Sequence, residues 1–232
     1  MYNPTLRAAI FEQFPEVRFA FSMKREPLGG GEKDVSEAEF LRSLGVNVDS
    51  IAMQKQIHSS TVKRVTGPGT YPDCDALITD SSGLFLRVAA ADCMPVFLYD
   101  PRTRAVGAVH SGWRGCVGGL VQKTLLSLRK EFSLSLADVR AFVGPSARTC
   151  CYEIGPEVAA LFGPDFLVAG RNMRPHLDMQ RHAVSQLTAV GVLPSHIEVS
   201  PYCTVCAQGL FHSYRRDRDR AGRNIGVIGI RE

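Results

Sequence analysis

The sequence lacks any apolar run close to the roughly 20 residues that a helix needs to cross a bilayer. Its first residues also lack the basic region, apolar stretch and small-residue cleavage site that mark a secretory signal peptide. Internal repeats and low-complexity tracts are absent as well. These absences predict a cytoplasmic protein that makes no use of a membrane.

A strong net charge is missing too, because 27 Lys and Arg residues stand against 23 Asp and Glu and leave +4. Most of this excess lies in residues 214–223, where five Arg and two Asp give +3. Such a segment can bind nucleic acid, a small molecule that carries phosphate, or nothing. Since two carboxylates interrupt it and no second basic stretch accompanies it, nucleic acid is the least favoured partner.

What the chain does have is 45% hydrophobic residues, enough for one buried core. Cores divide only in longer chains, so we expect a single catalytic domain over residues 1–232. The chain has seven Cys residues, which is an odd number, and it is long enough to fold without disulfide cross-links. We therefore expect reduced thiols rather than a disulfide framework. Some of these thiols are then available as metal ligands.

Apolar patterning predicts both strands and helices. Strands are expected at 17–22, on either side of a turn at 58–60, in the apolar runs 84–99 and 105–110, and at 139–144, 196–200 and 224–230. Helices are expected after a capping pair of Asp34 and Glu37, from Val117 to Leu128, at 155–162, and from Leu177 to Val190. Glycines at 27–33 mark a loop, either at the rim of a site or as a plain connector. This order predicts an α+β or mixed α/β sandwich rather than a regular βαβ barrel.

Three residues with metal-ligand chemistry stand in or beside the buried strands: His58, Cys93 and His110. Two His and one Cys with a fourth position open is the pattern of a catalytic zinc site, in which the metal lowers the pKa of a bound water. Their separations, 35 and 17 residues, fit no local finger, so the fold would have to bring them together. Taken singly, each residue is also compatible with a purely structural role.

A second interpretation uses the same atoms. A Cys93 thiolate with His58 or His110 as its base would form a cysteine-hydrolase dyad. The two mechanisms exclude each other, because a bound metal would occupy the thiolate. Asp92, a carboxylate in an apolar strand, needs a partner such as a ligand imidazole or backbone donors.

The remaining candidate groups are weaker. Cys203 and Cys206 form a C-x-x-C without a second pair at finger spacing, and the adjacent Cys150 and Cys151 are not expected to point to one site. Arg114, at the start of a predicted helix, can hold an anion such as phosphate or pair with a carboxylate. The roles open to Glu153 are those of a base, an orienting group or a helix-flanking charge.

Six motifs occur in order along most of the chain: QIH at 56–58, DALIT at 75–79, ADCMPV at 91–96, VHSGWRG at 109–115, GPS with CCYEIG at 144–155, and SYRRD with GR at 213–223. Together they resemble the YfiH-like, laccase-domain family. The resemblance implies a mixed β-sheet sandwich flanked by helices, of α/β/β/α type and similar to the catalytic domain of a cysteine-hydrolase toxin.

The resemblance also implies a zinc-dependent purine nucleoside phosphorylase that acts on adenosine, inosine, guanosine and methylthioadenosine, with adenosine deaminase activity. His58, Cys93 and His110 fall on the metal ligands of the family and are expected to serve catalysis. An older description of the family as copper polyphenol oxidases is disfavoured, because the sequence lacks the His-rich ligand pairs of a copper cluster. Further residues are expected to bind nucleoside or phosphate, namely Gln56, Arg114, Glu153, Arg215 and Arg223, or to support the ligands, namely Asp75 and Asp92.

The chain departs from the family pattern in two places. Its early loop offers Lys24 or Arg25 where the family has a fixed Arg, and His212 stands where apolar or aromatic residues are usual. Two other functions stay open at this point. One is hydrolysis of small amides or peptides, as in the editing of cell-wall precursors, and the other is a metal-binding interaction protein without catalysis.

Overall fold

The computed structural model describes residues 5–24, 36–170 and 174–231. Among them, two six-stranded sheets and one two-stranded hairpin form. The first sheet runs, in order, through β1 (Thr5–Leu6), β2 (Val17–Ser22), β14 (Asn224–Ile230), β7 (Phe85–Ala90), β3 (Ile51–Gln54) and β5 (Gly69–Tyr71). The second runs through β13 (Ile197–Val199), β10 (Arg140–Val143), β8 (Met94–Tyr99), β9 (Val106–Ser111), β6 (Ala76–Thr79) and β4 (Val62–Arg64). The hairpin is β11 (Leu167–Ala169) with β12 (Pro175–Leu177).

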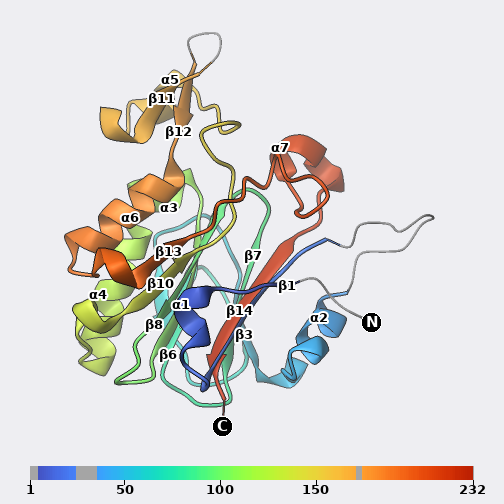
Figure 1. The fold of residues 1–232 in the computed structure, drawn as a ribbon, viewed down its shortest axis with the longest axis vertical. Helices are drawn as coiled ribbons and strands as arrows, with labels where there is room; N and C mark the ends of the chain where they lie inside the picture. The colour runs from blue at the N-terminus through green and yellow to red at the C-terminus, as the bar shows by residue number, and fades with distance from the viewer. Residues whose placement is uncertain (1–4, 25–35, 171–173, 232) are drawn as a thin grey trace.

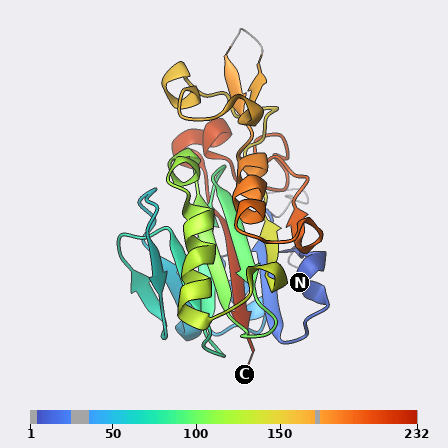
Figure 2. The same cartoon turned by 90° about the vertical axis from the view of Figure 1, so that its left-hand side faces the viewer.

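The two sheets pack face to face and helices cover their outer faces (Figures 1 and 2). Between the sheets lies an aromatic core in which Phe19 contacts Phe97 and Phe142 edge to face. Leu125 of α4 (Leu120–Phe132) and Leu187 of α6 (Met179–Ala189) pack on the second sheet. On the first sheet lies α2 (Glu37–Ser43). These layers confirm the predicted α/β/β/α sandwich.

Most predicted helices and strands are present, but the apolar run 84–99 forms two strands that belong to different sheets. Its first half is β7, which pairs with β14, and its second half is β8, which forms the expected hairpin with β9. The segment around His58 likewise connects β3 in the first sheet with β4 in the second. The chain therefore crosses between sheets at both places.

Two helix predictions need correction. The first helix is capped by Ser36, whose hydroxyl accepts the Glu39 N–H while the Glu39 carboxylate accepts the Ser36 N–H. Asp34 lies outside the described residues, as does the predicted loop at 27–33. The helix predicted from Val117 is broken, because Gly119 adopts φ 66° between α3 (Trp113–Val117) and α4.

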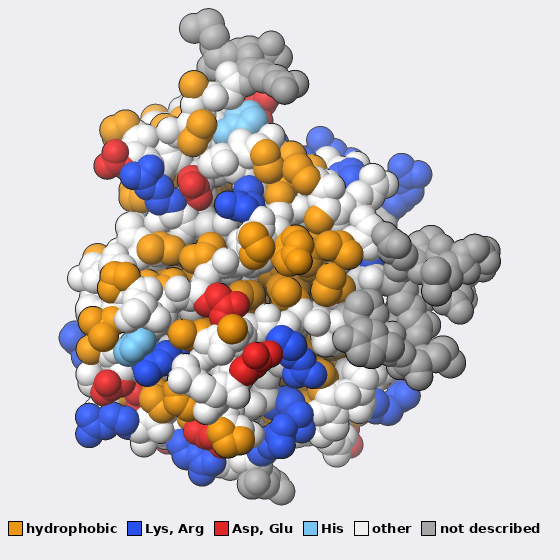
Figure 3. Space-filling model, viewed as in Figure 1, with side chains coloured by type: hydrophobic (Ala, Val, Ile, Leu, Met, Phe, Trp, Pro, Cys, Tyr) orange, Lys and Arg blue, Asp and Glu red, His pale blue; other side chains and the backbone are white. Residues whose placement is uncertain are grey.

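The shorter helices are α1 (Ala9–Glu12), α5 (Pro156–Ala159) and α7 (Tyr214–Asp217). No helix among the described residues combines the length and apolar character that a bilayer span requires. On the face drawn in Figure 3, Lys and Arg side chains are interspersed with acidic and hydrophobic ones.

Candidate metal centre and its two cavities

His58, Cys93 and His110 meet where the chain passes from one sheet to the other. His58 lies in the β3–β4 connection, Cys93 in the β7–β8 connection, and His110 on β9 beside β8. One ligand atom of each lies within 4.8 Å of the others. The two imidazole rings are 5.1 Å apart between centroids. The fold thus brings together the three residues that sequence separation keeps apart.

The backbone around these three residues is tightly constrained. His58 and Asp92, the neighbour of Cys93, adopt positive φ angles of 59° and 84°, a conformation that costs free energy in residues other than glycine. A Cβ atom on Gly112 would lie 3.0 Å from the Cys93 sulfur and 3.4 Å from His58 Nδ1. Position 112 therefore requires glycine if the two side chains are to stay where they are.

The buried carboxylate of Asp75 fixes the imidazole of His110 and the backbone of His58. It accepts hydrogen bonds from the backbone N–H groups of residues 57, 58 and 59, at 3.2, 3.1 and 2.6 Å, and from the Ser59 hydroxyl at 2.8 Å. It also lies 2.9 Å from His110 Nδ1. With Nδ1 bonded to a carboxylate, the Nε2 atom of His110 is the one left for a metal.

These contacts set the charges of the group. Burial raises the pKa of Asp75, but hydrogen bonds from His110 and Ser59 outweigh it and lower the pKa to about 2. Burial lowers the pKa of His110, whereas Asp75 and Cys93 raise it to about 9. Burial raises the pKa of Cys93, whereas His110 and His58 lower it to about 6. Without a metal, the group therefore carries a thiolate beside an imidazolium.

The donor set fits a zinc ion. Two imidazole nitrogens and one thiolate are ligands that zinc accepts, and three protein ligands leave one position open, as in catalytic zinc sites. A carboxylate behind one imidazole is the usual supporting arrangement. Among the described residues, the only other group of this kind is a set of four Cys residues.

Two cavities meet at His58 and Cys93, which line both of them. The larger, of about 570 Å³, is lined by Gln54, Gln56, Arg87, Tyr214 and Arg223, together with all three ligands. The smaller, of about 250 Å³, is lined by His58 and Cys93 and by Arg114, Tyr152, Arg215 and Arg218. A metal at this position would therefore face both cavities.

The smaller cavity is rich in positive charge. The Arg114 guanidinium stacks on Trp113 at 4.3 Å from the ring centroid, and that of Arg215 on Tyr152 at 4.9 Å. Neither of these groups nor Arg218 has a carboxylate partner among the described residues. Burial and the charge of Cys93 raise the pKa of Tyr152, so its phenol stays protonated at neutral pH. The cavity thus presents donors for an anion.

The larger cavity has a different polar character. Arg87 is neutralised by Glu37 through hydrogen bonds of 2.8 and 2.5 Å, and Gln56 is bonded through both amide atoms to the backbone of Ala89. Gln54 is only 4% exposed, and neither of its amide atoms has a hydrogen-bond partner among the residues that the structure describes. Buried polar atoms without partners are rare and indicate an absent partner such as a ligand. Nothing in the sequence distinguishes Gln54 as such a group.

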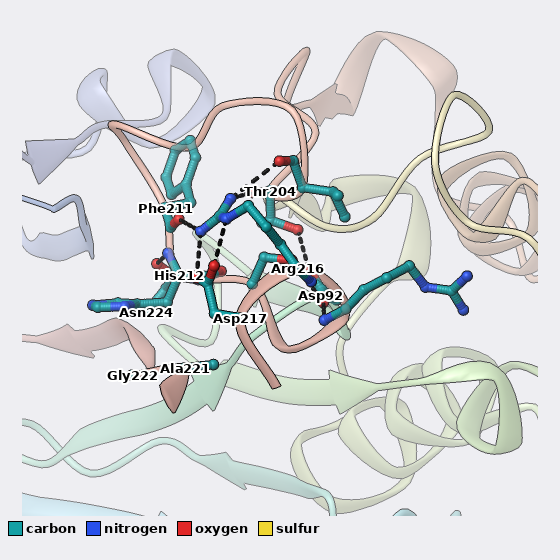
Figure 4. Close-up of polar contacts among 12 residues, drawn as sticks. Asp92, Thr204, Phe211, His212, Arg216, Asp217, Ala221, Gly222 and Asn224 are labelled. Carbon is teal, nitrogen blue, oxygen red and sulfur yellow. Dashed lines mark hydrogen bonds and ion pairs between the residues drawn. The ribbon is translucent and has the colours of Figure 1, made fainter. Parts of the chain in front are cut away.

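Asp92 supports the site differently from Asp75. Its carboxylate accepts hydrogen bonds from the Thr204 hydroxyl at 2.6 Å, the Ser213 hydroxyl at 3.0 Å and the Arg215 N–H at 2.6 Å. It therefore fastens the C-terminal segment beside Cys93 and does not hold a ligand imidazole. Figure 4 shows Arg216 above it, with its guanidinium directed at the Thr204 and Phe211 carbonyls and at Asp217.

Other predicted residues lie apart from the ligands. Glu153 forms an ion pair with Arg174 at 2.9 Å and is not among the described residues that line either cavity. Lys24 donates its backbone N–H to Leu210, and Arg25 lies outside the described residues. His212 donates its backbone N–H to the side-chain oxygen of Asn224 at 2.9 Å.

The prediction for the adjacent Cys150 and Cys151 is wrong. Their sulfurs lie 3.5 and 3.2 Å from that of Cys206, and with Cys203 they form one group whose ligand atoms are within 4.8 Å of one another. Residues 149–151 form a turn. Neighbouring side chains point to opposite faces only in an extended strand, so a turn allows both thiols to face the same point.

The α/β/β/α sandwich with a His₂Cys group between two cavities defines a candidate metalloenzyme. A family model described as multi-copper polyphenol oxidoreductase laccase matches residues 32–231, and the chain belongs to this family. A purine nucleoside phosphorylase from Aquifex aeolicus is 34% identical over 218 residues, which cover 94% of this chain and 97% of that protein. Purine nucleoside phosphorylase YlmD from Geobacillus stearothermophilus is 33% identical over 195 residues, 77% of this chain and 71% of that one.

Solved structures agree with this assignment. The crystal structure of the Geobacillus YlmD superposes with a TM-score of 0.87 at 27% identity and covers 98% of this chain and 96% of that one. The structure of the hypothetical protein YfiH from Bacillus licheniformis gives 0.84 at 25% identity, with 99% and 100% covered.

We predict that Asp75→Asn lowers zinc affinity by about 10- to 100-fold, because an amide cannot accept from all of the donors that orient the His110 imidazole and the backbone of His58. Asp73→Asn is the matched control, because it makes the same chemical change two residues away at an exposed position. This variant should bind zinc as the unaltered protein does. Competition titration with a chromogenic chelator measures both. Equal affinities in the two variants would contradict the role given to Asp75.

We also predict that iodoacetamide modifies Cys93 of the metal-free protein with a pH midpoint near 6, well below the value of about 8.5 for a free Cys. The pKa is lowered, so the thiolate forms and the rate rises as pH increases through 6, then levels off. Peptide mass spectrometry separates Cys93 from Cys116, whose pKa burial raises to about 12 and which should stay unmodified. A pH midpoint above 8 for modification of Cys93 would contradict the ion pair between its thiolate and the His110 imidazolium.

Proposed function

We propose that this protein is a zinc-dependent purine nucleoside phosphorylase that acts on adenosine, inosine, guanosine and methylthioadenosine. The observation that carries the proposal is the position of the three ligands between a cationic cavity and a larger cavity with an unpartnered amide. Relatives that bear the name purine nucleoside phosphorylase support the same reaction. His58, Cys93 and His110 would hold the zinc, whose chemistry is that of a Lewis acid at the reacting bond.

Zinc is proposed over copper on the donors available. The described residues offer one group of two His and one Cys and one group of four Cys, without the several His-rich pairs of a multicopper cluster. The copper in the family's description therefore finds no matching ligands in the part of the chain that the structure describes.

The cationic cavity is the proposed phosphate site. Arg114, Arg215 and Arg218 line it with guanidinium groups that have no carboxylate partner in the described part of the chain, and the planar fork of a guanidinium matches phosphate oxygens. The stacking of two of them on Trp113 and Tyr152 restricts their motion. A phosphate held there would present an oxygen toward the ligand group and the larger cavity.

The larger cavity is the proposed nucleoside site. Gln54 offers one donor and one acceptor in a plane, and glutamine amides pair in this way with the N6 and N7 atoms of adenine in nucleic acids. A neutral amide can also rotate to suit a 6-oxo purine, in keeping with a site that accepts several bases. Exposed Tyr214 lies at the boundary of both cavities.

In phosphorolysis, a phosphate oxygen forms a bond to the ribose C1′ as the bond from C1′ to the purine N9 breaks. The bonding electrons leave with the base, which takes up a proton to become the free purine. The guanidinium groups hold the phosphate in line with this bond, and Gln54 fixes the base. Adenosine deamination, in which water adds at the purine C6 and the 6-amino group leaves as ammonia to give inosine, is included in the proposal as a second reaction of the same site.

An amide hydrolase is the second candidate, favoured by one observation. Asp75, His110 and Cys93 stand in the order of a carboxylate, an imidazole and an activated thiolate, as in cysteine hydrolases. Activity on small amides that survives chelators and is lost on thiol alkylation would support it over the phosphorylase.

For the phosphate site, we predict that inosine yields hypoxanthine only when phosphate is present, and that Arg215→Met raises the KM for phosphate by about 10-fold or more through loss of a charged contact worth about 1.5 to 3 kcal/mol. Arg220→Met, an exposed residue of the same segment that lines neither cavity, is the control. Chromatography of products gives both rates. Phosphate-independent release of base would contradict the proposal.

For the nucleoside site, Gln54→Met keeps the side-chain length and removes both polar atoms. We expect the KM for adenosine to rise by about 5- to 10-fold, the effect of losing a hydrogen bond of about 1 kcal/mol, with the KM for phosphate unchanged. Gln122→Met, on the exposed face of α4, controls for the substitution itself. Unchanged nucleoside kinetics would remove Gln54 from the site.

A further inference from the structure

Four thiols gather outside the three-ligand site, and we refer to Cys150, Cys151, Cys203 and Cys206 as the four-cysteine cluster. All four sulfurs lie within 4.8 Å of one another. The Cys206 sulfur lies 3.2 Å from that of Cys151 and 3.5 Å from that of Cys150. Cys203 is buried, Cys151 is half-buried, and the other two are exposed.

Two turns supply these thiols, one at 149–151 and one at 203–206. A bridge between Ser146 and Cys203, with the Thr204 N–H donating to the Ser146 carbonyl at 3.1 Å, aligns the two segments. Backbone N–H groups of Arg148, Val205 and Cys206 donate to the Cys203 sulfur. These contacts fix the position of the Cys203 sulfur between the two segments.

We propose that the four-cysteine cluster binds a single zinc ion as a structural site. A tetrahedral zinc with zinc–sulfur distances of about 2.3 Å places its sulfurs about 3.8 Å apart, within the range found here. Four thiolates fill every position, so this zinc has no place for a substrate. An iron–sulfur cluster is disfavoured, because its ligand sulfurs bind different iron atoms and must stand farther apart.

The location gives this site a role in holding the cationic cavity together. Cys151 is followed by Tyr152, which lines that cavity, and between Cys203 and Cys206 lies Thr204, which binds Asp92. One ion would therefore join two segments that are over 50 residues apart in sequence. The first leads directly into Tyr152 in the cavity wall, and the second contacts that wall through the bond from Thr204 to Asp92. The inference concerns metal content and does not depend on the proposed phosphorolysis.

The test uses the full chain with the first site removed. His58→Ala with His110→Ala, purified under reducing conditions and loaded with zinc, should retain one zinc per chain by mass spectrometry of the metal. X-ray absorption should show four sulfur neighbours at about 2.3 Å. The unaltered protein should bind two zinc ions, and Cys206→Ser, at an exposed position, should lose one of them. Cys74→Ala, outside the cluster, should keep both.

Two results would overturn the proposal. One is a double His variant whose four cluster thiols are reduced and free but which takes up no zinc. The other is disulfide pairing of the cluster in protein isolated from cells with thiols blocked. If Cys206→Ser does not fold, cobalt substitution of the unaltered protein decides, because four thiolates give strong sulfur-to-cobalt charge-transfer absorption that one thiolate cannot give.

Discussion

The interaction on which the site depends is the buried carboxylate of Asp75. A carboxylate without solvent is costly unless it is fully hydrogen-bonded, and here three successive N–H groups, one hydroxyl and one imidazole supply the donors. The same contacts hold His58 in a left-handed backbone conformation and leave Nε2 of His110 toward Cys93. One buried charge thus determines the position of two ligands from distant parts of the chain.

The sandwich explains why the ligands can meet at all. Two of the connections that cross between the sheets, β3–β4 and β7–β8, carry His58 and Cys93 next to His110 on β9. The C-terminal segment packs beside the β7–β8 connection, where Asp92 binds Thr204, Ser213 and Arg215. The Arg side chains of this segment are of two kinds. The Arg216 guanidinium donates its hydrogen bonds to backbone carbonyls and Asp217, whereas Arg215 and Arg218 line the cationic cavity and can bind an anion there.

Local sequence patterns predict the strongly periodic elements, such as the β8–β9 hairpin, α6 and β14, because burial enforces their apolar spacing. They cannot show that residues 84–99 split between two sheets, since both halves are equally apolar. Side-chain chemistry indicates His58, Cys93 and His110 as one possible metal set and the family resemblance implies that they are ligands, but no local spacing can show that they converge. Gln54 and the four-cysteine cluster were not foreseen, because an unpartnered amide and a turn that directs adjacent thiols to one point are properties of three-dimensional packing.

The central claim is that the Asp75-supported His₂Cys group holds the zinc on which phosphorolysis depends. The most direct measurement follows the initial rate of hypoxanthine formation from inosine and phosphate while zinc is added back to chelated protein, with occupancy of the His₂Cys site measured in parallel. The account predicts a rate proportional to that occupancy. A rate that is already maximal when the His₂Cys site is empty would contradict it.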